Sequence, residues 1–241
     1  MDTGLVIVST GMFLGIVSQN AIGFGASYFV LPILPFFFEI SFFVPILLML
    51  YTVNTFLFAL REWKRVDRQI YLYIAPSALV GILIGTKILV SLDEDHLKKI
   101  LGVIIVFLGF YLILSDRIQS AKKISLAWGI PLGFISGIFS NISVANPPLV
   151  VFLKLRKAKK ESFYATLGTF FLFVNTAALS SFALNGFLSM EQVFIAFKLL
   201  PVLLLGSFLG KKLNKKIPEK LFQNIVSTFL VLSGFLLIIL S

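Results

Sequence analysis

The chain contains the same stretch of sequence twice. Residues 76–114 and residues 201–239 align without a gap at a constant offset of 125, and 12 of the 39 aligned positions are identical. The identical residues include Pro76/Pro201, Gly81/Gly206, Gly85/Gly210, Lys87/Lys212 and Gly109/Gly234. An apolar chain built from two copies of one unit is typical of secondary transporters, whose binding sites usually lie where the copies meet.

Shorter matches extend the repeat toward the N-terminus. Residues 53–55 (VNT) recur as residues 174–176 at an offset of 121. A Gly-x-x-x-Gly-x-x-Ser pattern at residues 11–18 recurs at residues 129–136, an offset of 118. These matches predict a single transmembrane domain over residues 1–241, with repeat one at about 4–120 and repeat two at about 125–241.

The composition indicates a membrane protein. Hydrophobic residues make up 58% of the 241 residues and charged residues 13%, where soluble domains have about a quarter charged. The apolar runs are long enough to span a bilayer as helices, and the alternation of a membrane barrel is missing. Residues 1–4 lack a basic segment, so we expect the first span, and not a cleavable signal, to direct the chain to the cell membrane as a multi-pass protein.

The net charge of +10 reflects Lys and Arg residues in short loops between apolar segments, which favours contact with membrane lipid over nucleic acid. The chain has no cysteine, and its one histidine, His96, falls in a polar loop. The sequence offers no metal-ligand cluster and no nucleophile motif. We therefore expect no enzyme, catalytic residue, metal or cofactor.

The basic residues also predict the topology. Apolar segments 5–38 and 126–153 are long, and each is broken by glycine, proline or polar residues. If each folds as a hairpin that returns to its starting side, 17 loop Lys and Arg residues face one side and only Lys98 and Lys99 the other. The prediction is an all-α polytopic membrane protein of two inverted repeats, each a broken, re-entrant helical hairpin plus three transmembrane helices. Both termini would then face outward.

The two breaks are the first candidate binding site. A helix that begins within the membrane presents N–H donors and a positive dipole end, which suit an anion. The residues concerned are Gly23, Gly25 and Ser27 in the first half and Asn141, Ser143 and Asn146 in the second. The alternative is that these residues serve packing or hinge motion, since small residues are common at helix contacts in membranes.

Four further polar residues lie within apolar segments: Asn54, Thr169, Asn175 and Lys198. Buried amides in lipid must bind either a neighbouring helix or the transported molecule. Lys198 could attract an anion, or its ammonium group could extend to the membrane surface. The Gly81/Gly85 and Gly206/Gly210 pairs are expected to be close-packing helix faces.

Several motifs together resemble the TauE/SafE sulfite exporter family, also described as the toluene-sulfonate uptake permease family. Residues 11–34 and 133–182 follow its pattern of broken glycine-rich segments, and residues 206–239 follow its closing Gly-x-x-x-Gly helix. The resemblance implies transport of sulfite, sulfonates or related organic anions. The chain departs from the family pattern at Asn146, which stands in place of a glycine, and at the polar residues Asn141 and Ser143.

The sequence thus predicts a secondary transporter of a small anion, of the sulfite or sulfonate type, that works by alternating access. The alternatives are a transporter or channel for another organic anion, or a membrane scaffold without transport activity. The expected partners are the anionic substrate and membrane lipid. The sequence also allows a coupling ion, either a proton or a sodium ion, and a homo-oligomeric state.

Overall fold

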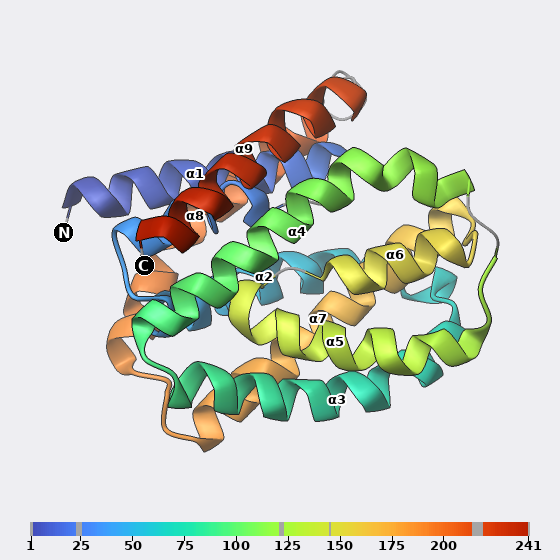
Figure 1. Ribbon diagram of the computed structural model, residues 1–241, viewed down its shortest axis with the longest axis horizontal. Coiled ribbons are helices and arrows are strands. Elements are labelled where there is room, and N and C mark those ends of the chain that lie inside the picture. Colours follow the sequence, from blue (N-terminus) through green and yellow to red (C-terminus); the bar gives the residue numbers. More distant parts are fainter. Residues whose placement is uncertain (1, 23–25, 121–122, 145, 214–218, 241) are drawn as a thin grey trace. The chain divides into compact units, whose positions relative to one another are not determined.

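A computed structural model describes residues 2–22, 26–120, 123–144, 146–213 and 219–240, which form helices and no strands (Figure 1). The first half contains α1 (Asp2–Ile22), short 3-10 helices at Ala26–Tyr28 and Leu34–Phe36, α2 (Ile40–Glu62), α3 (Arg68–Ser91) and α4 (Glu94–Ser120). The second half contains α5 (Gly129–Ser143), α6 (Pro147–Leu155), α7 (Lys160–Leu184), α8 (Met190–Leu213) and α9 (Glu219–Leu240).

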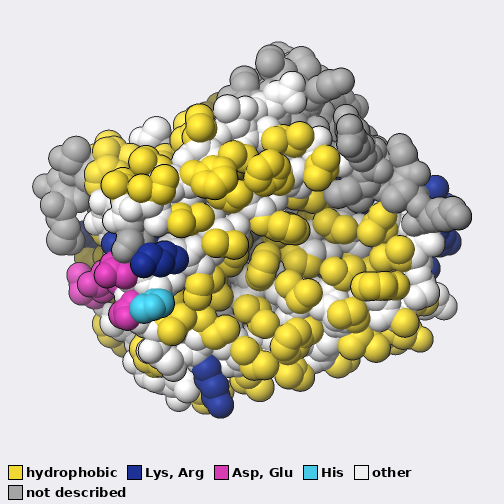
Figure 2. Space-filling view, viewed as in Figure 1, with side chains coloured by type: hydrophobic (Ala, Val, Ile, Leu, Met, Phe, Trp, Pro, Cys, Tyr) yellow, Lys and Arg dark blue, Asp and Glu magenta, His cyan; other side chains and the backbone are white. Residues whose placement is uncertain are grey.

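Among the described residues, five helical segments are long and apolar enough to cross a membrane. They are Arg68–Ser91, Glu94–Leu114, Leu126–Ser143, Glu161–Leu184 and Met190–Gly210. Shorter apolar helices cover Ile40–Phe56 and Val226–Leu240. Hydrophobic side chains dominate the surface in Figure 2, as expected of helices that face lipid.

The chain divides into two compact units that each combine elements of both sequence halves. Unit 1 comprises Met1–Phe43, Leu92–Leu114 and Phe194–Ser241, and unit 2 comprises Val44–Ser91 and Ser115–Val193. In each unit, the Gly-x-x-x-Gly helix of one half packs against the broken segment of the other half.

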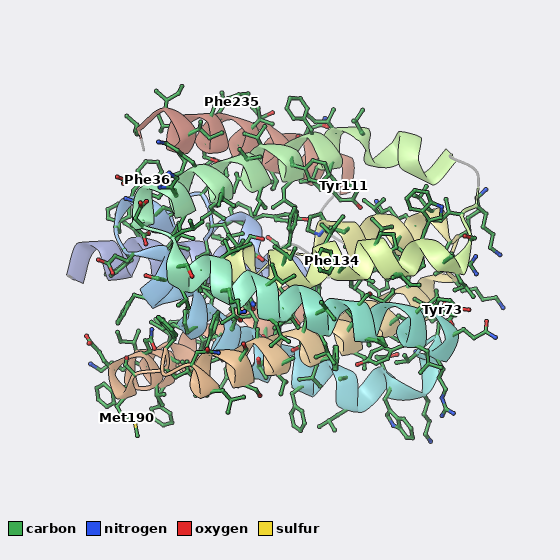
Figure 3. The ribbon with its side chains drawn as sticks, turned by 60° about the horizontal axis from the view of Figure 1, so that its bottom comes forward. Phe36, Tyr73, Tyr111, Phe134, Met190 and Phe235 are labelled. Carbon is green, nitrogen blue, oxygen red and sulfur yellow. The ribbon has the colours of Figure 1, made fainter. Side chains whose placement is uncertain are left out.

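In unit 2, α3 and α5 run parallel and touch through their backbones. A Cβ atom on Gly81 would collide with the carbonyl oxygen of Phe134, and one on Gly85 would lie 2.9 Å from the carbonyl oxygen of Ile138. Tyr73 of α3 and Phe134 of α5 mark this pair of helices in Figure 3. The absence of side chains at these glycines lets the helix axes approach, as the sequence predicted.

In unit 1, α8 meets α1 in the same way. A Cβ atom on Gly206 would lie 3.3 Å from the carbonyl oxygen of Phe13, and one on Gly210 would lie 2.5 Å from that of Val17. Phe13 and Val17 precede Phe134 and Ile138 by 121 residues. The repeat is therefore present in the helix contacts within each unit as well as in the sequence.

The aligned helices α4 and α9, both in unit 1 up to Leu114, make a reciprocal contact (Figure 1). A Cβ atom on Gly109 would lie 2.5 Å from Cγ2 of Val231, and one on Gly234 would lie 2.7 Å from Cγ2 of Val106. Each residue pair maps onto the other at the offset of 125. Gly102 lies beside Gly234 while Gly109 lies beside Ser227, so the two helices run antiparallel.

The second broken segment folds as a helical hairpin. Its two ends are joined because Arg156 Nη1 donates to the carbonyl oxygen of Ile124 at 2.7 Å, and Ile124 N donates to the carbonyl oxygen of Leu155 at 3.4 Å. With nine residues, α6 is about 14 Å long, which is too short to cross the hydrocarbon core. The first segment also folds back, since Gly11 of α1 packs against Phe29 and Ile33.

Candidate binding site at the α5–α6 junction

The junction between α5 and α6 has unusual backbone chemistry. Val144 ends α5 with φ +51°, a left-handed conformation that is strained for a β-branched side chain. Asn146 then precedes α6 without forming a side-chain cap. Because Pro147 and Pro148 occupy the first two helical positions, Leu149 is the first residue of α6 with a backbone N–H group. The helix start is therefore poorer in donors than an ordinary helix N-terminus.

A buried hydrogen-bond network holds the last turn of α5 in place. Asn141 Nδ2 donates to the carbonyl oxygen of Ile82 at 2.6 Å and to Thr86 Oγ1 at 2.9 Å. Thr86 Oγ1 is in turn 2.9 Å from Ser181 Oγ of α7. Since a carbonyl oxygen only accepts hydrogen bonds, the contact with Ile82 determines which end of the Asn141 amide faces α3. The network ties α3, α5 and α7 of unit 2 together.

Several buried polar atoms of unit 2 have no hydrogen-bond partner among the described residues. They are Asn141 Oδ1, Asn146 Nδ2, Asn146 Oδ1, Ser136 Oγ, Thr169 Oγ1 and, at the far end of α6, Arg156 Nε. Asn141 is fully buried and Asn146 is only 3% exposed. An amide without partners in an apolar environment costs several kcal/mol, roughly 2–7 in transfer measurements. A bound polar molecule or water would recover this energy.

The buried polar side chains of the described residues are all uncharged. They are serine, threonine, asparagine and glutamine, and they provide both donors and acceptors. A polar junction can orient a small hydrogen-bonding solute. The guanidinium group of Arg156 is partly buried, with its Nε atom enclosed, but Arg156 follows the C-terminal end of α6 and lies about 14 Å along the helix from Asn146. The described residues of the junction itself therefore bring no cationic group to neutralise the charge of a solute.

A family model for the sulfite exporter TauE/SafE matches residues 7–237. The chain belongs to the TauE/SafE family. No solved structure and no curated protein matches the chain significantly. The family consists of transporters and not enzymes, and membership implies a multi-pass membrane transporter of sulfite- or sulfonate-type anions.

Unit 2 contains most of the candidate site residues that the sequence singled out in this family member. Asn141 and Asn146 lie at the junction, while the hydroxyl of Ser143 is engaged with the carbonyl oxygen of Phe139 at 3.0 Å. Asn54 on α2 and Asn175 on α7 are buried, and Thr169 Oγ1 is also enclosed. Because Asn141 Oδ1 and both polar side-chain atoms of Asn146 have no partner among the described residues, the geometry singles out Asn141 and Asn146.

The remaining candidates lie in unit 1 or outside the described residues. Ser27 is buried at the start of the first 3-10 helix. Gly23 and Gly25 lie outside the described residues. The Lys198 side chain is exposed, and its Nζ atom lies 4.6 Å from the centroid of the Phe194 ring, an arrangement suited to the lipid-facing surface of α8.

Sequence reasoning missed three residues of the networks: Asn20, Thr86 and Ser181. Asn20 precedes Asn141 by 121 positions, and its Nδ2 atom lies 3.5 Å from Ser207 Oγ of α8. The 118-residue offset inferred from glycines concealed this pairing, whereas helix contacts in both units follow an offset of 121. The repeated VNT motif, also at 121, was the signal that could have revealed it.

Proposed function

We propose that this chain is a secondary transporter of a sulfur oxyanion or organosulfonate in the cell membrane, and that the α5–α6 junction binds the substrate. The observation that carries the proposal is Asn146, a buried amide that interrupts the hairpin with neither side-chain atom hydrogen-bonded to described residues. Asn141 and Thr169 would contribute further polar contacts. Gly23, Gly25 and Ser27 are the corresponding candidates that the sequence gives for the first half.

The contacts support an inverted-repeat architecture for this transporter. The aligned helices α4 and α9 run antiparallel, and their reciprocal glycine–valine contacts are the pattern expected at a two-fold axis. If both helices cross the membrane, the two copies have opposite orientations. The adjacent ends of the α5–α6 segment support a re-entrant hairpin, which is the arrangement that places the basic loops on one side.

Such a site could serve alternating access. The α5 arm is held to α3 by backbone contact at Gly81 and Gly85 and by the Asn141 network, so it would form the fixed wall. Movement elsewhere would then expose the junction to each side in turn. The coupling ion is a proton or a sodium ion, and a carrier or channel for another organic anion is the competing function.

Flux measurements in proteoliposomes test the proposal. Purified protein would be tested with sulfite, thiosulfate, alkanesulfonates and carboxylates, each with and without an imposed proton or sodium gradient. Protein-dependent flux of a sulfur anion that saturates with concentration is the expected result. Flux of carboxylates alone would favour the competing carrier, and the absence of flux for every anion under all gradients would refute the transport function.

A further inference from the structure

The hydrogen-bonding groups at the junction restrict the form of the anion, and this inference rests on the proposed function. Asn141 Nδ2 is used by Ile82 and Thr86, so the side chain has only its Oδ1 acceptor left. Asn146 offers one acceptor oxygen and the two N–H donors of its amide nitrogen. Pro147 and Pro148 cannot donate, and the Val150 N–H group is bound to the carbonyl oxygen of Asn146 at 3.3 Å. The oxygens of Asn141 and Asn146 therefore need a hydrogen-bond donor from the solute, just as the amide nitrogen of Asn146 needs an acceptor.

The lack of a cationic side chain at the junction, among residues 141–144 and 146–148, adds a second restriction. Transferring an ion from water to a low-dielectric site costs a Born energy that grows with the square of its charge. A dianion would thus pay about four times the cost of a monoanion. The Asn146 amide group can stabilise one charge by hydrogen bonding, but it cannot replace a cationic side chain.

We infer that the α5–α6 junction takes a singly charged anion that carries its own hydrogen-bond donor. Hydrogensulfite and hydroxyalkanesulfonates meet both conditions, whereas the sulfite dianion and sulfate meet neither. The anionic oxygens accept from Asn146 Nδ2, and the donor of the solute satisfies Asn141 Oδ1. When sulfite is the cargo, each transported ion carries one proton with it.

Binding titrations on the purified full-length protein test this inference. The first comparison is hydroxyethanesulfonate against propanesulfonate, in which a methyl group replaces the hydroxyl at nearly constant shape. We expect hydroxyethanesulfonate to bind about tenfold more tightly, because the analogue leaves a buried acceptor unpaired. We also expect sulfate to bind more weakly than either, and the affinity for total sulfite to rise as the pH falls from about 8 to about 6.

Two variants separate the role of Asn141 from a general effect on folding. Asn141→Ala should abolish the preference for hydroxyethanesulfonate over propanesulfonate. Ser140→Ala is the matched control, since this neighbouring buried hydroxyl donates to the carbonyl oxygen of Gly137 at 2.8 Å, and it should keep the preference. If Asn141→Ala does not fold, the relative affinities of the unaltered protein for hydroxyethanesulfonate, propanesulfonate and sulfate still test the inference.

The outcomes distinguish this inference from the function on which it rests. Equal affinity for the two sulfonates, or tighter binding of sulfate than of hydroxyethanesulfonate, would overturn the inference and leave anion transport intact. An affinity for sulfite that falls as the pH is lowered would overturn it as well. If no anion of the series binds, the proposed function fails and this inference fails with it.

Discussion

Asn141 on α5 donates to Oγ1 of Thr86 on α3 at 2.9 Å, and this bond links the last turn of α5, which ends at Ser143, to α3, which continues to Ser91. The same α3 surface is occupied by glycines, so the two backbones are already in contact where the amide begins. A short polar side chain can therefore reach across without leaving a void. The bond both secures the end of α5 and leaves Asn141 Oδ1 for another partner.

Thr86→Val should lower the free energy of unfolding by about 1–2 kcal/mol, because it removes the partner of both Asn141 and Ser181 at nearly constant volume. Thr176→Val is the matched control. The exposed Thr176 hydroxyl bonds only to the carbonyl oxygen of Leu172 one turn earlier, at 2.7 Å, so its loss should change the stability little. Thermal or denaturant unfolding of both variants in the same detergent gives the comparison, and equal stabilities would show that the network does not hold the helices together.

Asn146→Leu should abolish anion binding without loss of stability. The substitution keeps the bulk of the side chain and removes two buried polar atoms that have no partner among the described residues. The unfolding temperature without anion should therefore be unchanged or higher, while the increase in unfolding temperature that an added anion causes should disappear. Asn54→Leu is the comparison, since this buried amide has a partner in the protein and its loss should lower the stability. Unchanged anion flux in folded Asn146→Leu protein would exclude the junction as the binding site.

Much of this organisation could be predicted, because the lengths of the apolar runs and the internal repeat can be read directly from the sequence. Apolar run length identifies helices that can span a bilayer, and Pro147-Pro148 marks the start of α6 within one residue. The offset of 125 identifies Gly109 and Gly234 as equivalent before any contact is known. The interruption between residues 141 and 146 likewise follows from amides and prolines that no continuous apolar helix would contain.

The network partners could not be predicted in this way, because they depend on which helices meet. Thr86 belongs to repeat one and Asn141 to repeat two, and nothing local at either position indicates the other. The two residues pair because α3 packs alongside α5, which belongs to the other half of the sequence. Such packing depends on the tertiary structure. Thr86 aligns with Lys211 at the offset of 125, so the repeat itself gave no hint of a polar network there.

Gly81→Ala should destabilise the protein strongly, by about 1–3 kcal/mol or more, because the added methyl group would collide with the backbone carbonyl of Phe134 and neither helix can shift alone. Gly186→Ala serves as the comparison. Gly186 has no atom within 4 Å of an added Cβ, so its only cost arises from its φ of +74° and should be about 1 kcal/mol. Thermal unfolding distinguishes the two, and a Gly81→Ala protein as stable as the unaltered one would contradict close backbone packing of α3 on α5.

The predicted topology can be tested by labelling single cysteines in this naturally cysteine-free chain. In the inverted-repeat arrangement, Lys159→Cys before α7 lies on the cytoplasmic side, whereas Asp95→Cys at the start of α4 and Phe187→Cys between α7 and α8 lie outside. All three native side chains are exposed, so access to the thiol should depend on the side of the membrane. A membrane-impermeant maleimide added to intact cells should label positions 95 and 187 and should label position 159 only after permeabilisation. Labelling of position 159 in intact cells would mean that the α5–α6 segment crosses the membrane, and the two halves would then not be inverted copies.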